Sequence, residues 1–557
     1  MILIARIITE LHHFHTHIAS FNLVYQHQLP QNGTSMINKQ PNTIIEQDVI
    51  NRAVWAACDT FRGTIDSSIY KDYVLTMLFL KYISDVWQDH YDGFENSFGK
   101  YPEMIAEMLS HERFVLPPEA SFYELYQQRN QPGNGARIDR ALAMIARENR
   151  NKLANVFQDI QFNSTKLGDE KQKNDILCHL LEDFAKPELN LRPSRVGTLD
   201  IIGNAYEFLI RNFASTSGKK AGEFYTPPEI SQLIAHLVEP QQDDTICDPT
   251  CGSGSLLMKC GKLISERFHN NQYHLFGQEA IGSTWALAKM NMFLHSEDKH
   301  RIEWGDTLRE PKLLRDATSL LQFDVVVANP PFSLEKWGHE SADDDVYGRF
   351  EYGMPPRTKA DYAFILHMIA SMKPDTGRMA VVVPAGVLFR GGQEGVIRRR
   401  LIEENLLEAV IGLPEKLFYG TGIAAVILFF RSNKRDNNIL FIDAHCDCEV
   451  GKGQNLLRAQ DIERILSTFR ERVDVPNFAH LASTDEVAAN QYNLNIPRYI
   501  IAQEPVVEID LEKLREERDL LRLQLAELDL QLDEHMRQLI EETEFVYLND
   551  VERRLNE

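Results

Sequence analysis

The sequence predicts an α/β fold in which helical segments lie before and after a parallel sheet. Between residues 245 and 430, short apolar runs alternate with helical patterns, as they do where helices join parallel strands. Residues 43–186 show helical periodicity alone, and residues 508–542 form one long helical pattern. These three observations predict a sheet domain preceded by a helical domain and followed by a long helix.

The composition is that of an ordinary globular protein. The chain has 557 residues, 43% of them hydrophobic, enough for about three or four domains. Its apolar runs are much shorter than the roughly 20 residues that a membrane helix needs, so we expect no membrane span. Seven cysteines without a convincing signal peptide argue against a disulfide framework and favour the cytoplasm. Their spacing does not match a zinc site, and we expect no metal.

The net charge of −22 restricts the partners that the chain can bind alone. A chain this acidic repels a polyanion such as DNA at long range. Binding to DNA therefore requires either a partner that supplies positive charge or a local basic face, for instance around Arg390, Arg398, Arg399 and Arg400. The same arginines are also compatible with a solvated helix face.

Helical patterns dominate the chain before the sheet. Residues 1–42 are predicted to be a leader outside the fold, disordered or not native, because Met36 opens a more ordinary sequence. The helical domain that follows shows no grouping of side chains that suggests chemistry. Residues 199–212 then form a helix with one apolar face, and a polar stretch, residues 215–221, comes after it.

Two aromatic residues precede the next predicted helix, in the run Glu223-Phe224-Tyr225-Thr226-Pro227-Pro228. Thr226 can cap a helix that opens at the prolines. The aromatic rings before it are suited to walling a small-molecule pocket. An ordinary capped turn is the alternative that this run alone does not exclude.

A glycine-containing loop follows the first predicted strand, residues 245–247, in the run Asp248-Pro249-Thr250-Cys251-Gly252-Ser253-Gly254-Ser255. Its glycines allow the backbone to approach a ligand closely at the start of the helix predicted for residues 256–268. The dinucleotide fingerprint requires a third glycine soon after Gly254, but the next one is Gly261. The loop therefore disfavours a nicotinamide cofactor.

Acidic residues follow the next two predicted strands, residues 273–276 and 301–304. Glu279 is well placed to accept hydrogen bonds from two ribose hydroxyls, and Asp306 could meet an adenine amino group. Each acid alone is more often a turn residue than a ligand. Because parallel strands bring their carboxyl ends to one edge of the sheet, the successive polar residues together predict a nucleoside pocket.

The run Asn329-Pro330-Pro331-Phe332 follows the buried strand predicted for residues 323–328. The amide oxygen of Asn329 and a carbonyl held rigid by the prolines can accept both hydrogens of a planar amine. Phe332 can stack on the ring that bears this amine. The run thus suits methylation of an exocyclic amino group, although a strand-ending turn with a core Phe332 is the alternative.

The remaining sequence completes the sheet and ends in a long helix. The polar stretch 333–359 is too long for a simple connection and is predicted to be a substrate-facing or mobile loop. Strands are expected at residues 379–383 and 406–413, and residues 424–430 are expected to close the sheet, with a further strand at residues 439–444. In the last helix, leucines at three- and four-residue steps indicate a partner helix, or else packing on its own chain.

The runs at Phe224-Tyr225-Thr226-Pro227, Asp248 to Ser255, Gly277-Gln278-Glu279 and Asn329 to Phe332, in this order, resemble the modification subunit of type I restriction-modification systems. These subunits are gamma-class DNA adenine-N6 methyltransferases. The resemblance extends from about residue 43 to the end and implies a Rossmann-like sheet that depends on S-adenosylmethionine. It implies these cofactor-binding residues: Glu223, Phe224, Tyr225, Thr226, Pro227, Pro228, Asp248, Gly252, Ser253, Gly254, Ser255, Glu279 and Asp306. It implies these catalytic residues: Asn329, Pro330, Pro331 and Phe332.

The resemblance also implies partners and a division of the chain. The substrate is adenine flipped out of duplex DNA, the partners are a specificity subunit that binds two copies of this chain and a restriction subunit, and no membrane is involved. Methylation of RNA or of protein glutamine, and a purely structural cofactor-binding subunit, remain alternatives. The domains expected are a leader (1–42), a helical domain (43–186), the catalytic domain (187–432), its extension (433–507) and a partner-binding coiled-coil-like helix (508–557).

Overall fold

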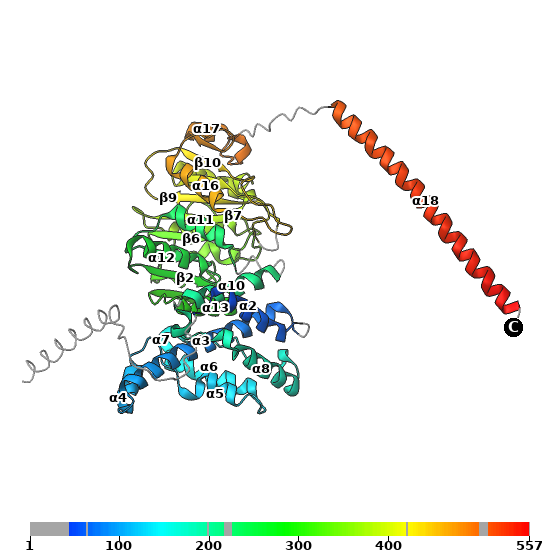
Figure 1. The fold of residues 1–557 in the computed structure, drawn as a ribbon. Helices are drawn as coiled ribbons and strands as arrows, with labels where there is room; N and C mark the ends of the chain where they lie inside the picture. Colours follow the sequence, from blue (N-terminus) through cyan, green and yellow to red (C-terminus); the bar gives the residue numbers. More distant parts are fainter. Residues whose placement is uncertain are drawn as a thin grey trace, which may run out of the picture.

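The computed structural model describes residues 44–62, 65–197, 200–216, 225–418, 422–500 and 511–555. The predicted leader and the candidate residues Glu223 and Phe224 lie outside these ranges. Within them, a helical part is stacked on a large sheet, and one long helix stands apart (Figure 1). The α/β class predicted from the sequence is confirmed.

The helical part is built around α3 (Ser67–Phe98). Every residue from Tyr73 to Val86 is buried, which is typical of a helix that other elements cover on all sides. The surrounding elements are α2 (Gln47–Ala56), η1 (Ala57–Thr60), α4 (Pro102–Ser110), η2 (Pro118–Ala120), α5 (Phe122–Gln127), α6 (Asn134–Glu148), α7 (Arg150–Leu153), η3 (Thr165–Leu167), α8 (Glu170–Phe184), η4 (Pro187–Leu189) and α9 (Pro193–Val196).

A buried carboxylate ties α3 to its neighbours. The side chain of Asp85 is fully buried and pairs with Lys81 one helical turn earlier. It also accepts a hydrogen bond of 2.5 Å from the Tyr123 hydroxyl of α5 and one of 2.6 Å from the backbone amide of Leu191. These donors satisfy a charge that would otherwise be costly to bury.

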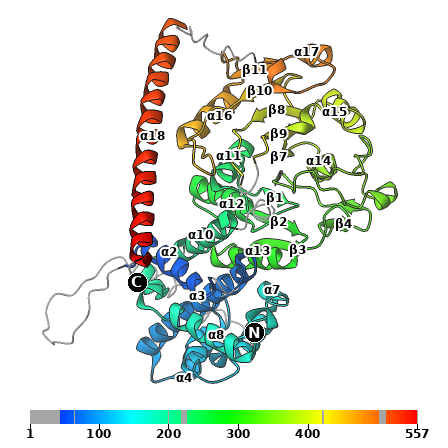
Figure 2. The ribbon, with the colours of Figure 1, turned by 90° about the vertical axis from the view of Figure 1, so that its right-hand side faces the viewer.

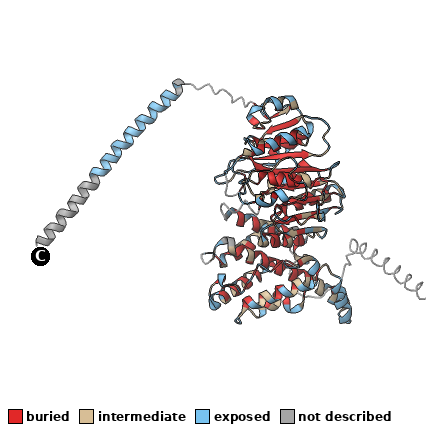
Figure 3. Ribbon diagram, turned by 180° about the vertical axis from the view of Figure 1, so that it is seen from behind, coloured by how far each residue is buried: buried red, intermediate tan, exposed pale blue. Residues whose placement is uncertain are grey.

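Helix α10 (Asp200–Thr216) connects the helical part to the sheet. It packs on α2 and α3 and also on α13 (Gly282–Leu294), a helix of the sheet domain. The hydroxyl of the fully buried Tyr206 lies 3.4 Å from the Leu287 carbonyl oxygen, and the rings of Phe79 and Phe293 have centroids 5.3 Å apart. One continuous apolar core therefore runs through both parts, and Figure 3 shows buried residues throughout them.

Within the described ranges, nine strands form one mixed sheet in the order β11-β10-β8-β9-β7-β6-β1-β2-β3. The strands are β1 (Thr245–Asp248), β2 (His274–Glu279), β3 (His300–Trp304), β6 (Val325–Ala328), β7 (Arg378–Pro384), β8 (Leu407–Gly412), β9 (Ala425–Arg431), β10 (Ile439–Asp443) and β11 (Ala479–Ala482). The run β7-β6-β1-β2-β3 is parallel, as is the pair β8 and β10. A small hairpin, β4 (Leu314–Asp316) and β5 (Ser319–Leu320), lies between β3 and β6 in the chain.

Alternate residues of the sheet belong to two separate cores. In β6, Val325 and Val327 belong to the core that includes α12 (Ser255–Phe268), whereas Val326 and Ala328 belong to the one that includes α14 (Asp361–Ala370). Figure 2 shows α11 (Pro228–Val238), α12 and α16 (Ala459–Glu471) on one side of the strands. Helices α14 and α15 (Gln393–Glu403) lie on the other side. The strands are covered on both faces, which explains their continuous apolar sequences.

The expectation that residues 424–430 close the sheet is wrong. Strand β9 lies inside the sheet, antiparallel to both β7 and β8, and the sheet continues through β10 to β11. The cause is the apolar sequence of β9, which suits any position where both faces are covered. Strand β11 and the β4-β5 hairpin were not expected, because these short segments carry no clear alternation.

Helix α18 (Leu511–Leu555) stands apart from the stacked parts (Figure 1). Every side chain described between residues 512 and 537 is exposed, leucines included. Over this stretch the helix therefore does not pack on its own chain. No helix in the described ranges has both the length and the apolar composition needed to cross a membrane.

We expect Asp85→Ala to lower the free energy of unfolding by on the order of 3–5 kcal/mol, because it leaves the buried Lys81 charge and two other donors unpaired. The shift of the urea unfolding midpoint measures this loss. Glu107→Ala, on an exposed position of α4, is the matched control and should change the midpoint little. Equal shifts for both variants would contradict the role assigned to Asp85.

Candidate active site

The parallel order β6-β1-β2-β3 places four strand ends at one edge of the sheet. A narrow pocket at this edge joins residues that are far apart in the sequence. It is lined by Tyr225, Thr226, Asp248, Thr250, Cys251, Gly252, Ser253, Ser255, Leu256 and Asn329. The pocket therefore unites the loop after β1, the segment before α11 and the residue after β6, whereas Glu279 and Asp306, which the sequence also assigns to the site, are not among the residues that line it.

The glycine loop approaches the pocket through its backbone. Gly254 precedes α12 with φ of +80°, a conformation that side chains disfavour. A Cβ atom at Gly254 would lie 2.7 Å from the Met292 side chain. The loop is held by the amide of Cys251, which donates to the Gln278 carbonyl at 3.0 Å. The first amides of α12 thus lie beside the pocket, where a helix start favours negative or polar groups of a ligand.

Asp248 ends β1 with its carboxyl group buried against this loop. It accepts a hydrogen bond of 2.9 Å from the amide of Thr250. Burial, reinforced by the nearby Glu279 carboxylate, raises the pKa of Asp248 to about 7. The group is therefore poised between its neutral and charged forms near neutral pH, and a cationic ligand would favour the charged form.

Glu279 ends β2 and is 7% exposed. Its carboxylate accepts hydrogen bonds from the amides of Gly252, at 3.0 Å, and Ile281, at 2.8 Å. Burial raises the pKa of Glu279, and the backbone hydrogen bonds oppose this rise. The acid predicted at the end of β2 is thus joined directly to the glycine loop.

Asp306 follows β3 and binds mainly its own turn. One carboxylate oxygen accepts from the amides of Leu308 and Arg309, at 2.9 and 3.0 Å, and the other pairs with the Arg309 guanidinium at 3.2 Å. The neighbouring Gln278, 1% exposed, fixes this loop by donating to the carbonyl oxygens of Gly305 and Glu310, at 3.1 and 3.0 Å. No local sequence pattern indicates this role of Gln278, because its partners Gly305 and Glu310 are distant in sequence.

Asn329 is one of the residues that line the pocket. Its Nδ2 donates to the Thr226 hydroxyl at 3.1 Å. Its Oδ1 is buried and has no hydrogen-bond partner among the described residues. Thr226 is not the helix cap that the sequence suggests: α11 begins at Pro228 with Pro227 at its N-cap and no side-chain capping bond. Thr226 instead orients the amide of Asn329.

Phe332 is half-buried and contacts a second aromatic ring. The centroid of its ring lies 5.7 Å from the centroid of the Phe418 ring, and the two ring planes make an angle of 70°. Phe418 comes from the loop after β8 and was not among the candidate residues. Its sequence surroundings, a loop containing glycine, carry no specific signal.

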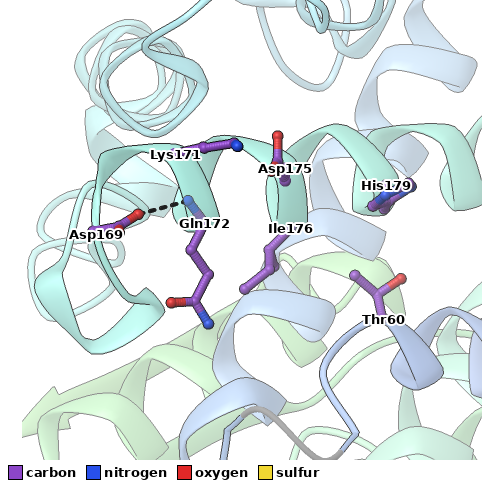
Figure 4. Close-up of a pocket in the computed structure, with 7 residues that line it drawn as sticks. All are labelled: Thr60, Asp169, Lys171, Gln172, Asp175, Ile176 and His179. Carbon is purple, nitrogen blue, oxygen red and sulfur yellow. Dashed lines mark hydrogen bonds between the residues drawn. The ribbon is translucent and has the colours of Figure 1, made fainter.

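Pro227 and Pro228 follow Thr226 and lie at the start of α11. Pro228 opens α11 and lines a different hollow, between α11 and α12, together with Lys259 and Lys262. Another hollow lies on the helical part, beside α8 (Figure 4). It is lined by Thr60, Asp169, Lys171, Gln172, Asp175, Ile176 and His179. Neither hollow contains residues of the predicted site other than Pro228.

The arginines that were considered as a basic face do not form one. Arg398 is buried and donates to backbone carbonyls, including that of Arg390 at 3.0 Å. Arg390 itself binds two carboxylates. Arg399 is exposed but pairs with Glu403 at 2.7 Å, which leaves Arg400 as the exposed member with no ion pair among the described residues. Successive residues of a helix point in different directions, so the run divides between interior and surface.

The polar stretch after Phe332 has a small core of its own. Trp337 is 1% exposed and donates its indole N–H to the Pro356 carbonyl at 3.0 Å. Arg349 is 5% exposed, pairs with Asp345 at 2.7 Å and donates to the Thr307 carbonyl at 3.2 Å. These contacts fix the stretch against the loop after β3.

Comparison with known protein families agrees with this architecture. The family model described as N-6 DNA Methylase matches residues 197–506, and the model described as HsdM N-terminal domain matches residues 50–184. The first match covers more than half of the chain and includes every strand of the sheet.

Individual relatives extend the match to most of the chain. The type I restriction enzyme MjaVIII methylase subunit of Methanocaldococcus jannaschii is 31% identical over 487 residues, covering 85% of this chain and 81% of the relative. The MpnII methylase subunit of Mycoplasma pneumoniae is 29% identical, covering 84% and 92%. A crystal structure of the type I methyltransferase subunit from Streptococcus thermophilus, 34% identical, superposes with a TM-score of 0.72 over 82% of this chain and 100% of that one. The chain belongs to the family of type I restriction-modification methylase subunits, which are adenine-N6-specific DNA methyltransferases.

Proposed function

We propose that the chain transfers a methyl group from S-adenosylmethionine to N6 of an adenine flipped out of duplex DNA. The observation that carries this proposal is the amide of Asn329. Its nitrogen is engaged by Thr226, and its buried oxygen is left to accept a hydrogen bond from an incoming donor. An unpaired buried acceptor is costly, so a site that keeps one is suited to a ligand that donates there.

The catalytic work we assign to Asn329, Pro330, Pro331 and Phe332 is the positioning of the amine. The N6 nitrogen is a weak nucleophile because its lone pair is delocalised into the ring. The Asn329 oxygen and the Pro330 carbonyl would accept its two hydrogens and favour a pyramidal nitrogen, while Pro331 stiffens the turn. Phe332, supported by Phe418, would stack on the base and offset the cost of flipping it, a few kcal/mol. Orientation thus supplies most of the rate enhancement.

The residues around the glycine loop fit S-adenosylmethionine. When bound, this cofactor supplies an electrophilic methyl group on a cationic sulfonium. Asp248 offers a buried carboxylate whose charged form a cation would favour, and the start of α12 offers amides to polar groups. We assign the methionine end to residues 223–227 and the body of the cofactor to residues 252–255. We assign the ribose to Glu279 and the adenine to Asp306, whose carboxylate is already engaged in its own turn.

The partners follow from the charge and from α18. The chain is acidic overall, with a net charge of −22, and the arginines that were one candidate for a basic face do not form one. We therefore propose that a specificity subunit, bound by two copies of this chain, supplies most of the contacts to DNA, and that a restriction subunit joins the full complex. The exposed leucines of α18 provide a surface for the specificity subunit. We also propose the division of the chain predicted from sequence, with a helical domain (43–186), a catalytic domain (187–432), its extension (433–507) and this helix (508–557).

We expect Asn329→Ala to reduce methyl transfer by roughly 10²-fold or more, because the amine loses its acceptor. Cofactor affinity should change little. The measurement compares N6-methyladenine formation by the complex with its specificity subunit and cofactor binding by calorimetry. Methylation of DNA at the wild-type rate by this variant, or methylation of RNA or protein instead, would refute the assignment.

Cofactor affinity should rise several-fold between about pH 6 and about pH 7.5. The reason is that the pKa of Asp248 is raised to about 7, so its ionised fraction increases over this window, and only the ionised form attracts a cation. The dissociation constant measured across this pH range tests the effect. In Asp248→Asn the dependence should be lost; an unchanged rise in that variant would show that another group titrates.

Replacing Leu521, Leu525 and Leu528 together by Glu should abolish assembly with the specificity subunit. These residues share one face of α18, and charges there would be buried against a partner helix. Co-elution in size-exclusion chromatography reports assembly, and cofactor binding should remain. The control is Leu523→Glu with Leu530→Glu: both positions are 70% exposed and lie on the opposite face, so assembly should persist. Loss of assembly in both variants would argue against a specific face.

A further inference from the structure

The turn that follows Phe332 contains a residue in the left-handed region. Ser333 has φ of 52°, a conformation that residues other than glycine, asparagine and aspartate disfavour. Because Ser333 directly follows Phe332, its backbone angles determine where the end of the catalytic run points. Something in the structure must hold this conformation.

Asp361, the first residue of α14, makes that contact. It is 2% exposed, and one carboxylate oxygen accepts from the Ser333 amide at 2.8 Å. The other oxygen lies 3.4 Å from the Ser333 hydroxyl. Asp361 does not serve as the cap of its own helix, whose N-cap is Ala360 and has no side-chain capping bond. Its carboxylate is directed at the turn instead.

Arg390 provides the counter-charge. Its Nη2 donates to the second oxygen of Asp361 at 2.8 Å, and its Nε lies 2.9 Å from the carboxylate of Glu394. Arg390 follows β7, the strand next to β6, and its carbonyl is held by the buried Arg398. Gly386 makes room for it, since a Cβ atom there would lie 3.0 Å from Nε of Arg390. The carboxylate of Asp361 is thus fixed from the neighbouring strand.

We propose that Asp361, fixed by Arg390, is a positioning residue for methyl transfer. It holds Ser333 in the left-handed conformation and so sets the orientation of the Pro330 carbonyl and the Phe332 ring toward the target amine. This inference rests on the proposed function, because it assigns a support to the catalytic run rather than a new reaction. Asp361 acts only through Ser333 and does not itself touch the substrate.

The test is methyl transfer by the complex that contains the Asp361→Asn variant. Asparagine keeps the size of the side chain but loses the charge that binds Arg390. We expect kcat to fall by ten- to a hundredfold, with cofactor affinity unchanged within about twofold. Adding Ser333→Gly to this variant should recover at least fivefold of kcat, because glycine adopts positive φ without steric cost. A general loss of packing would not be repaired by that change.

Asp345→Asn is the matched control, since Asp345 is also a buried carboxylate paired with an arginine but does not contact Ser333. If Asp345→Asn lowers kcat, adding Ser333→Gly should not restore it. If Asp361→Asn does not fold, as judged by circular dichroism, Arg390→Lys replaces it, with a smaller loss and the same recovery expected. Unchanged kcat in Asp361→Asn, no recovery by Ser333→Gly, or equal recovery in Asp345→Asn would each overturn the proposal.

Asn329→Ala, measured in parallel, distinguishes failure of the positioning role of Asp361 from failure of the proposed methyl transfer. If Asn329→Ala is inactive while Asp361→Asn is fully active, the positioning role fails and the proposed function stands. If Asn329→Ala retains wild-type activity, the catalytic role of the whole run fails, whatever the Asp361 variants show.

Discussion

The hydrogen bond between Asn329 and Thr226 is the contact on which the arrangement of the site depends. It joins two segments that are 103 residues apart and that both line the pocket. It also decides which atom of the amide is engaged, because the nitrogen donates to Thr226 and the buried oxygen has no partner among the described residues. A shift of either segment would change both the shape of the pocket and its hydrogen-bonding character. The two segments can meet because β1 and β6 are parallel neighbours in the sheet.

Much of the fold could be predicted from the sequence, and the errors have a common cause. Eight of the strands in the sheet could be predicted, most clearly where burial on both faces leaves a continuous apolar run, as in β6, β7 and β9. The same pattern does not tell the direction of a strand or which strands lie next to it, so the position of β9 inside the sheet, antiparallel to β7 and β8, was missed. Strand β11, with its mixed sequence at the sheet edge, carried no signal at all.

For the site, local runs were more informative than single residues. The glycine loop, Asp248 and Asn329 line one pocket, and each was recognisable because several unusual residues stand together. Phe418 and Gln278 act through contacts with residues distant in sequence, which no local run records. The arginines from 398 to 400 show the opposite error: adjacent in sequence, they divide between the interior and the surface.

The single apolar core that passes from α3 through α10 to the sheet has a mechanical consequence. Two bodies that share one core lack the sparsely packed boundary at which domains slide or hinge. A force applied to the helical part is therefore transmitted directly to the strand ends. If a partner binds the helical part, the strand ends that carry the site move with it as one rigid body. The position of the site relative to the DNA is then set by how the partner binds the helical part.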